Sequence, residues 1–249
     1  MIKTAVIMSV YNEEKHIRKA IESIMNQTYN KWIFYIMIDG STDNTHDICM
    51  EYDEDERIIV YSRKENKGLA KSLNDLIKIV MRYHPKISYI ARQDGDDVSL
   101  PDRLKKQIYF LNKNKDYGMV GSWQNNIDDN GTIISSNKTH ENNKDIIKDL
   151  FNDNPFCHGS VVFRVSIFKD VGLYDEDFAR CQDYDLYLRI IRKYKVANIP
   201  EFLYNWRDGF EFHNMISVRK HYVGLARYKR YCDYMQIPYC KSNYKENHF

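Results

Sequence analysis

Cysteine, proline and glycine are all scarce in this chain of 249 residues. The five cysteines are widely spaced and none forms a Cys-x-x-Cys pair, so the sequence indicates neither a zinc site nor a disulfide framework. Long apolar runs are also missing, because none reaches the roughly 18 residues of a membrane-spanning helix and Thr4–Val10 is too short for a signal segment. Together these absences predict a cytoplasmic protein in a reducing compartment.

A strong excess of one charge is missing too, since the net charge is only +2. This balance gives no support for a nucleic-acid partner. The charge is unevenly distributed, however, and from His213 to the C-terminus seven Lys and Arg residues stand against Asp233 and Glu246. We predict that residues 213–249 form a basic helical tail, which either packs on its own domain or makes peripheral contact with an anionic membrane.

Apolar, strand-like runs alternate with amphipathic segments through the first hundred residues. Strands are predicted at Ala5–Val10, Trp32–Ile38, Arg57–Tyr61 and Ile87–Ala91. Apolar residues at helical spacing lie between them, and Asn12 is predicted to cap the first helix. This alternation is typical of a mostly parallel α/β sheet with helices on both faces, which binds ligands beyond the carboxyl ends of its strands.

The second half of the chain alternates less regularly. Strands are predicted at Met119–Trp123, Thr132–Ser135 and Ser160–Arg164, with a short helix near residues 146–151. A last core helix is predicted over Asp183–Tyr194.

Three carboxylates, Asp94, Asp96 and Asp97, directly follow the fourth predicted strand. Like charges this close repel one another, so a proton or a cation is expected among them. Mg²⁺ and Mn²⁺ prefer carboxylate oxygens and often share them with substrate phosphates, which favours a metal–diphosphate site over a solvated acidic turn. An EF-hand calcium loop is excluded, because Val98 and Ser99 stand where an acid and a glycine are required.

Other charged side chains lie at similar positions. Asp39 ends the second predicted strand, where it could accept a hydrogen bond from a uracil or thymine ring; a helix cap formed by its neighbours is the alternative. Asp183 and Asp185 open the last predicted helix outside its apolar stripe, where two exposed acids would also complement the helix dipole. Arg189 is predicted to point outward on that helix, and Arg207 is a candidate phosphate contact, a surface arginine being the alternative.

The segment from Ala91 to Leu104, with its Arg-x-Asp-x-Asp-Asp pattern, Pro101 and Arg103, resembles the Asp-x-Asp region of family 2 glycosyltransferases. Further segments resemble motifs of that family, in the family's order, between Lys3 and Arg207. These segments are Tyr11-Asn12-Glu13, Asp39 with Gly40-Ser41, Asn66 with Gly68, and Asp183 with Asp185. Their shared order is more specific than any single motif.

The resemblance implies a GT-A fold, with a Rossmann-like, mostly parallel central sheet, a smaller mixed acceptor-side sheet and a C-terminal helix. A single domain would span residues 1–212, with a nucleotide-binding half (1–100) and an acceptor half (101–212). The implied activity is metal-dependent, inverting transfer of a sugar from a nucleoside diphosphate sugar, with UDP or another pyrimidine nucleotide, to a hydroxyl of a glycan or lipid-linked acceptor.

The resemblance also implies roles for individual residues. Asp183 would be the general base, and Mn²⁺ or Mg²⁺ would be held chiefly by Asp96 with help from Asp94 or Asp97. The donor nucleotide would contact Tyr11, Asn12, Glu13, Asp39, Asn66, Gly68, Asp94, Gly95 and Arg207.

Three positions depart from the family pattern, the mildest being Val10, which replaces a proline context before Tyr11. Ile38 stands in place of the first of two acids before Gly40, and Gln182 replaces the Glu that usually precedes the base. A nucleotide-sugar-binding protein without catalysis is therefore one alternative. A metal-dependent nucleotidyltransferase is the other, but it would need a glycine-rich loop that Ser9–Lys15 does not supply. The sequence carries no signal for the oligomeric state.

Overall fold

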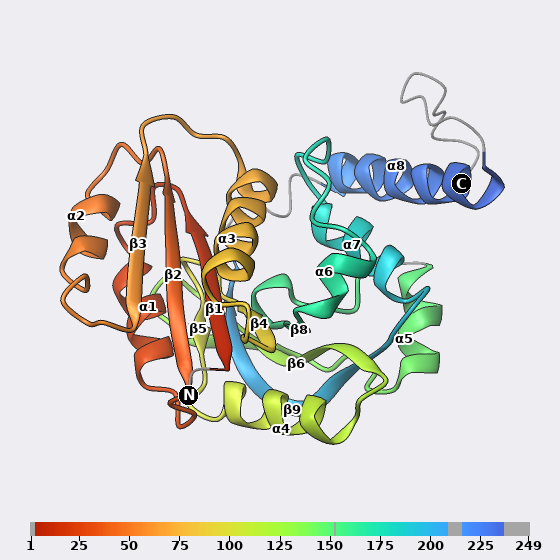
Figure 1. Ribbon diagram of the computed structural model, residues 1–249, viewed down its shortest axis with the longest axis horizontal. Coiled ribbons are helices and arrows are strands. Elements are labelled where there is room, and N and C mark those ends of the chain that lie inside the picture. Colours follow the sequence, from red (N-terminus) through yellow and green to blue (C-terminus); the bar gives the residue numbers. More distant parts are fainter. Residues whose placement is uncertain (1–2, 152, 209–215, 237–249) are drawn as a thin grey trace.

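The computed structural model describes residues 3–151, 153–208 and 216–236, and its strands form one continuous mixed sheet (Figure 1). The strands are β1 (Thr4–Val10), β2 (Trp32–Asp39), β3 (Ile58–Arg63), β4 (Tyr89–Arg92), β5 (Val98–Ser99), β6 (Tyr117–Ile127), β7 (Ile133–Asn137), β8 (Val162–Arg164) and β9 (Lys195–Arg207). Their order in space is β3-β2-β1-β4-β8-β6-β9-β5, with β7 beside β6.

Helices fill the connections between these strands. They are α1 (Ile17–Met25), α2 (Thr45–Met50), α3 (Leu69–Tyr83), α4 (Arg103–Lys113), α5 (Asn143–Leu150), the 3-10 turn η1 (His158–Ser160), α6 (Ser166–Asp170), α7 (Gln182–Ile190) and α8 (Ile216–Met235).

The first four strands in the spatial order pair in parallel, as predicted. In β1, Ala5 and Ile7 belong to one buried cluster, whereas Val6 and Met8 belong to the other. Both faces of a strand are therefore buried, which explains why the sequence shows continuous apolar runs there. Helix α3 covers the first face, and α1 and α4 cover the second.

The remaining strands form a mixed region that continues the same sheet. Antiparallel β8 joins β4 to β6, and β6 and β9 run parallel to each other. The long β9, blue in Figure 1, curves along the lower part of the molecule. Near its C-terminal end it pairs with β5, which directly follows the acidic segment Asp94–Asp97. This pairing brings Arg207, at the end of β9, to the carboxyl end of β4.

Helix α8 packs against α7 at one side of the molecule (Figure 1). Leu225 and Ala226 of α8 are buried, and the described cations of the helix make internal contacts: Lys229 pairs with Asp175 and Arg230 with Asp185. In the described residues, no helix is long and apolar enough to cross a membrane. The predicted boundary between residues 212 and 213 lies outside the described residues.

Several local predictions were wrong. Asn12 does not cap the first helix: it adopts a left-handed conformation (φ 55°), and α1 begins at Ile17 after His16. Asp185 is not an exposed acid, because its carboxylate is fully buried between Arg189 and Arg230. Arg189 correspondingly points inward.

Candidate active site

The loops after β1 and β2 are joined by hydrogen bonds beyond the carboxyl ends of the sheet. The Asn12 side chain accepts from the backbone N–H of Thr42 (2.8 Å), and the backbone N–H of Glu13 donates to Thr45 Oγ1 (2.8 Å). The ring of Tyr11 stays 47% exposed above these loops. The three residues predicted from the first motif therefore form one side of an open, polar surface.

Asp39 anchors the loop between β3 and α3. Its buried carboxylate accepts hydrogen bonds from the backbone N–H groups of Lys67 (3.0 Å) and Gly68 (2.8 Å), and Arg63 Nε lies 3.3 Å away. Gly68 has φ +87°, which disfavours any residue with a side chain, and Asn66 Oδ1 also accepts from its N–H (2.9 Å). Asp39, Asn66 and Gly68 thus form a single unit.

Gln93 holds the acidic segment from beneath. It is fully buried, and its amide donates to the carbonyls of Asp94 (3.0 Å) and Asp97 (3.1 Å) while it accepts from Ser99 Oγ (2.6 Å). The segment is consequently folded back on one side chain, which fixes the positions of its three carboxylates.

Asp94 pairs with the buried guanidinium of Arg92. Arg92 Nε also donates to His158 Nε2 (3.3 Å), which lies 2.9 Å from the Tyr174 hydroxyl. Burial, and then the charge of Arg92, hold the pKa of His158 well below its usual range, so the imidazole is neutral. His158 is therefore a structural support for Arg92 rather than a charged group.

Arg207 donates hydrogen bonds to the acidic segment from both its backbone and its side chain. The fully buried Asp97 Oδ1 accepts from the Arg207 N–H (2.7 Å), and Arg207 Nε donates to the carbonyl of Asp96 (2.8 Å). Burial, followed by Asp96 and Asp94, raises the pKa of Asp97 well above its ordinary value. Arg207 is a buried partner of the acidic segment, so it is not a surface arginine.

The excess of negative charge is seen most clearly at Glu13 and Asp96. Burial, then the neighbouring Asp96 and Asp94, raise the pKa of Glu13 to about 8. Burial, then Asp94, raise the pKa of Asp96 to about 6. Gly95 lies between these groups with no room for a side chain, because a Cβ there would lie 2.6 Å from Val10 Cγ1. A cation at this point would relieve the repulsion.

The donor set fits a divalent metal that is shared with a ligand. In the part of the chain that the structure describes, no three His, Cys, Asp or Glu side chains are arranged as a ready-made metal cluster. Mg²⁺ typically takes only one or two carboxylates and completes its shell with substrate phosphates and water. Asp96 makes no ion pair among the described residues, and Asp97 Oδ2 is buried without a hydrogen-bond partner there, so both can supply oxygens.

Asp183 lies in a cleft of about 650 Å³ at the start of α7. Asn154 Nδ2 donates to its Oδ2 at 2.7 Å. Asp94, from the end of β4, lines the same cleft. The structure therefore brings Asp94 and the predicted base to one cavity, whereas Asp96, Asp97 and the predicted nucleotide contacts other than Asp94 do not line it. Glu13 and Arg207 lie beside the acidic segment.

Sequence reasoning missed several residues that support this site. Arg92 and Arg103 are both fully buried, and Arg103 donates to the backbone carbonyls of Arg92 (3.0 Å) and Ser160 (3.2 Å). An arginine that ends an apolar strand was a usable signal for Arg92. Asn154 and Tyr204 lie in segments that resemble family motifs, but sequence reasoning assigned neither residue a role. The hydroxyl of the buried Tyr204 accepts from the Asp94 N–H (3.2 Å).

Comparisons with known proteins agree with this arrangement. The family model of glycosyl transferase family 2 matches residues 5–172. An uncharacterized glycosyltransferase of Methanocaldococcus jannaschii is 36% identical over 208 residues, covering 82% of this chain and 70% of that protein. The O-antigen biosynthesis glycosyltransferase WbnJ of Escherichia coli is 35% identical over 213 residues, covering 82% of this chain and 78% of that protein.

Solved structures show the same architecture. TarS of S. aureus in complex with UDP-GlcNAc matches 90% of this chain and 66% of its own, with a TM-score of 0.69 at 17% identity. The mannosyltransferase PcManGT of Pyrobaculum calidifontis in complex with GDP-Man and Mn²⁺ matches 96% of this chain and 65% of its own, with a TM-score of 0.68 at 14% identity.

The fold is therefore that of the GT-A glycosyltransferases. The match over residues 5–172 and the identity with named glycosyltransferases define the family as well. This chain belongs to glycosyltransferase family 2, and it is a glycosyltransferase enzyme.

Proposed function

We propose that this enzyme transfers a sugar from a nucleoside diphosphate sugar, carried by UDP or another pyrimidine nucleotide, to a hydroxyl of a glycan or lipid-linked acceptor, with inversion. The observation that carries the proposal is the cleft lined by both Asp94 and Asp183. A diphosphate bound at the acidic segment would direct its sugar toward Asp183. Polysaccharide biosynthesis is the fitting context, since WbnJ is named for O-antigen synthesis and TarS and PcManGT bind nucleotide sugars.

Asp183 is the proposed general base. Its carboxylate takes the proton of the acceptor hydroxyl while that oxygen attacks the anomeric carbon, and the bond from this carbon to the diphosphate oxygen breaks. Because the attack comes from the side opposite the leaving group, the anomeric configuration inverts. Asn154, which donates to Asp183 Oδ2 at 2.7 Å, would fix the orientation of this carboxylate.

The other predicted residues are proposed to hold the donor. Tyr11, Asn12 and the unit of Asp39 would bind the base and ribose, and Arg207 would lie near the diphosphate. Mn²⁺ or Mg²⁺, held by Asp96 with Asp94 or Asp97, would supply positive charge that stabilises the leaving nucleoside diphosphate. The raised pKa values of Asp96 and Glu13 support a cation at this position.

Release of nucleoside diphosphate from a panel of nucleotide sugars, with Mn²⁺ or Mg²⁺, tests the proposal. We expect metal-dependent release from one donor, loss of that release in Asp96→Ala, and no change in Asp177→Asn, a surface acid that is 81% exposed. Asp183→Asn should abolish transfer but keep UDP binding in calorimetry. Transfer at the normal rate by Asp183→Asn would contradict the base assignment, and UDP binding without any release would favour a binding-only protein.

A further inference from the structure

Two hollows of the surface meet beside Asp183. The inner one is the cleft of about 650 Å³ that holds Asp94 and Asp183, and the outer one measures about 680 Å³. They share a wall made of Asn137, Thr139, Asp153, Asn154 and Pro155. Because Asn154 lines both hollows and also donates to Asp183, the outer hollow begins at the side chain that holds the proposed base.

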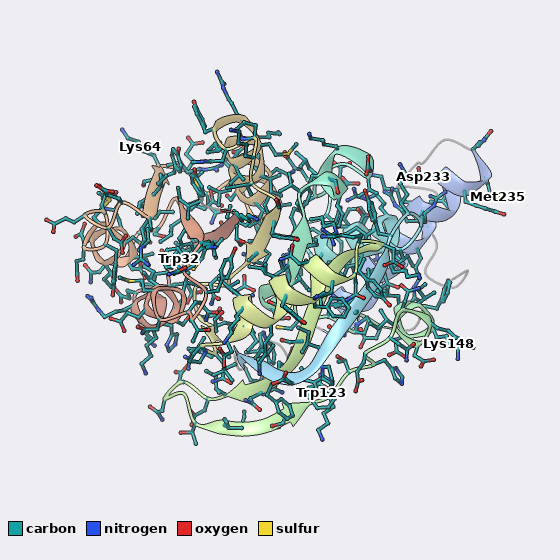
Figure 2. The ribbon with its side chains drawn as sticks, turned by 60° about the horizontal axis from the view of Figure 1, so that its bottom comes forward. Trp32, Lys64, Trp123, Lys148, Asp233 and Met235 are labelled. Atoms are coloured by element: carbon teal, nitrogen blue, oxygen red, sulfur yellow. The ribbon has the colours of Figure 1, made fainter. Side chains whose placement is uncertain are left out.

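An aromatic ring lines the outer hollow. Trp123, on β6, is half-buried at the outer side of the molecule beside β9 (Figure 2), and its indole N–H donates to the carbonyl of Thr139 (2.9 Å). Phe202 supports the ring at a centroid distance of 5.4 Å, and the flexible, exposed Lys138 lies over it with Nζ at 5.1 Å. A ligand can displace such a lysine and pack an apolar face on the indole ring, as the C–H face of a sugar does.

A polar side chain lines the same hollow as this ring. Asn137, on β7, is exposed, and its amide can donate to and accept from sugar hydroxyls. An apolar platform with a few polar groups at its edge is the usual composition of a small-molecule subsite.

Charged side chains also line the two hollows. Among the described residues, the cations are Lys138, Arg180 and His140, the last paired with Asp149 at 2.5 Å. The described carboxylates are Asp94, Glu141, Asp149, Asp153, Asp183 and Asp208. Carboxylates accept hydrogen bonds from sugar hydroxyls, and the cations donate to them.

We propose that the two hollows form one acceptor groove for an oligosaccharide of two or more sugars. The sugar that receives the transfer lies beside Asp183, and the preceding sugar packs against Trp123. This inference rests on the proposed glycosyl transfer and adds the class of acceptor to it.

A glycan microarray carrying neutral and anionic oligosaccharides, probed with the labelled full chain in the presence of UDP and Mn²⁺, tests the groove. We expect capture of glycans of at least two residues, and at least tenfold weaker capture by Trp123→Ala. Trp123→Phe, which keeps an aromatic ring on Phe202, should restore most of the capture. Tyr109→Ala removes an aromatic ring that is 64% exposed on α4, outside both hollows, and should leave capture unchanged.

Two results would overturn the inference: equal capture by Trp123→Ala and the wild-type chain, or no capture of any glycan of two or more residues. Donor hydrolysis and UDP calorimetry on the wild-type chain separate this from a failure of the proposed function. If the donor is bound and hydrolysed while the array result is negative, only the acceptor groove is refuted. If no nucleotide binds, the proposed glycosyl transfer itself fails.

Discussion

Glu13 carries a proton in the folded, metal-free chain that the unfolded chain releases. Its pKa is raised from 4.5 to about 8 by burial and by Asp96 and Asp94. Between these two values the folded state binds more protons than the unfolded state, so the free energy of unfolding falls as the pH rises from about 4.5 to about 8. This loss of stability is the cost of keeping several carboxylates together without a cation.

Replacing Glu13 by Gln should remove that loss. We expect Glu13→Gln to raise the melting temperature of the chain in EDTA at pH 8, with a smaller gain or none at pH 5, because Gln does not titrate. Thermal unfolding at several pH values measures this. Glu14→Gln, an exposed neighbour, is the matched control. A gain for Glu13→Gln that is equal at pH 5 and pH 8 would contradict the assignment.

For single residues, the sequence was informative where their position depends on their immediate neighbours in the chain. Asp94, Asp96 and Asp97 follow an apolar strand in the chain, and they lie at its carboxyl end in the structure. The burial of Asp185 could not be predicted in the same way, because one of its partners, Arg230, belongs to the separate helix α8. The burial of a carboxylate depends on such distant partners, which local periodicity does not contain.

The short 3-10 turn η1 packs closely against Tyr204 and Asp94 through Gly159. A Cβ on Gly159 would overlap the Tyr204 hydroxyl and lie 2.7 Å from Asp94 Oδ2. Gly159→Ala should therefore displace Asp94 or Tyr204 and lower metal-dependent donor hydrolysis at least tenfold, with Gly159→Val lower still. Initial-rate measurements at saturating donor check this. An unchanged rate in Gly159→Ala would show that the turn can move away without disturbing Asp94.

Helices α7 and α8 are joined by a buried ion pair. Arg230 Nε lies 3.0 Å from Asp185 Oδ1, and Asp185 is fully buried. Arg230→Ala leaves Asp185 with Arg189 alone, so we expect a loss of about 1–3 kcal/mol in the free energy of unfolding. Urea denaturation measures it. Asp233→Asn removes only the exposed partner of Arg230 and should cost less than about 0.5 kcal/mol; an equal loss in both variants would contradict the role of Asp185.

Strand β9 was the longest element that the sequence did not predict. It contains Pro200, and its apolar and polar residues alternate poorly. Its pairing with β6 also shifts register: Ser122 pairs with Ile199, but Trp123 pairs with Phe202. A proline and a bulge interrupt the period of two that identifies a strand. Its last residue, Arg207, was nevertheless predicted as a phosphate contact, because its charge could be recognised without the strand that carries it.

For the whole molecule, the alternation of apolar runs predicted the parallel half of the sheet correctly. Buried parallel strands such as β1 and β2 leave a continuous apolar signal. The mixed half gave no comparable signal, since β7 is exposed along its whole length and β8 has only three residues. The joining of Asp94 and Asp183 in one cleft depends on this mixed half, so the sequence predicted both residues but not the cavity between them.

The C-terminal helix α8 is part of the folded core rather than an added tail. Leu225, Ala226 and Cys232 are buried, and Val223 lines the cleft that holds Asp183. A chain that ends at Asp208 should therefore unfold at a clearly lower temperature than a chain that ends at Gln236, since it exposes the apolar surface beneath α8 and separates Asp185 from Arg230. Differential scanning fluorimetry compares the two chains, and glycan capture by each shows whether the missing wall of the cleft matters for the acceptor. Equal melting temperatures would mean that α8 stabilises nothing beyond itself. In that case the ion pair between Arg230 and Asp185 would contribute nothing to the free energy of unfolding. The Arg230→Ala measurement tests this independently.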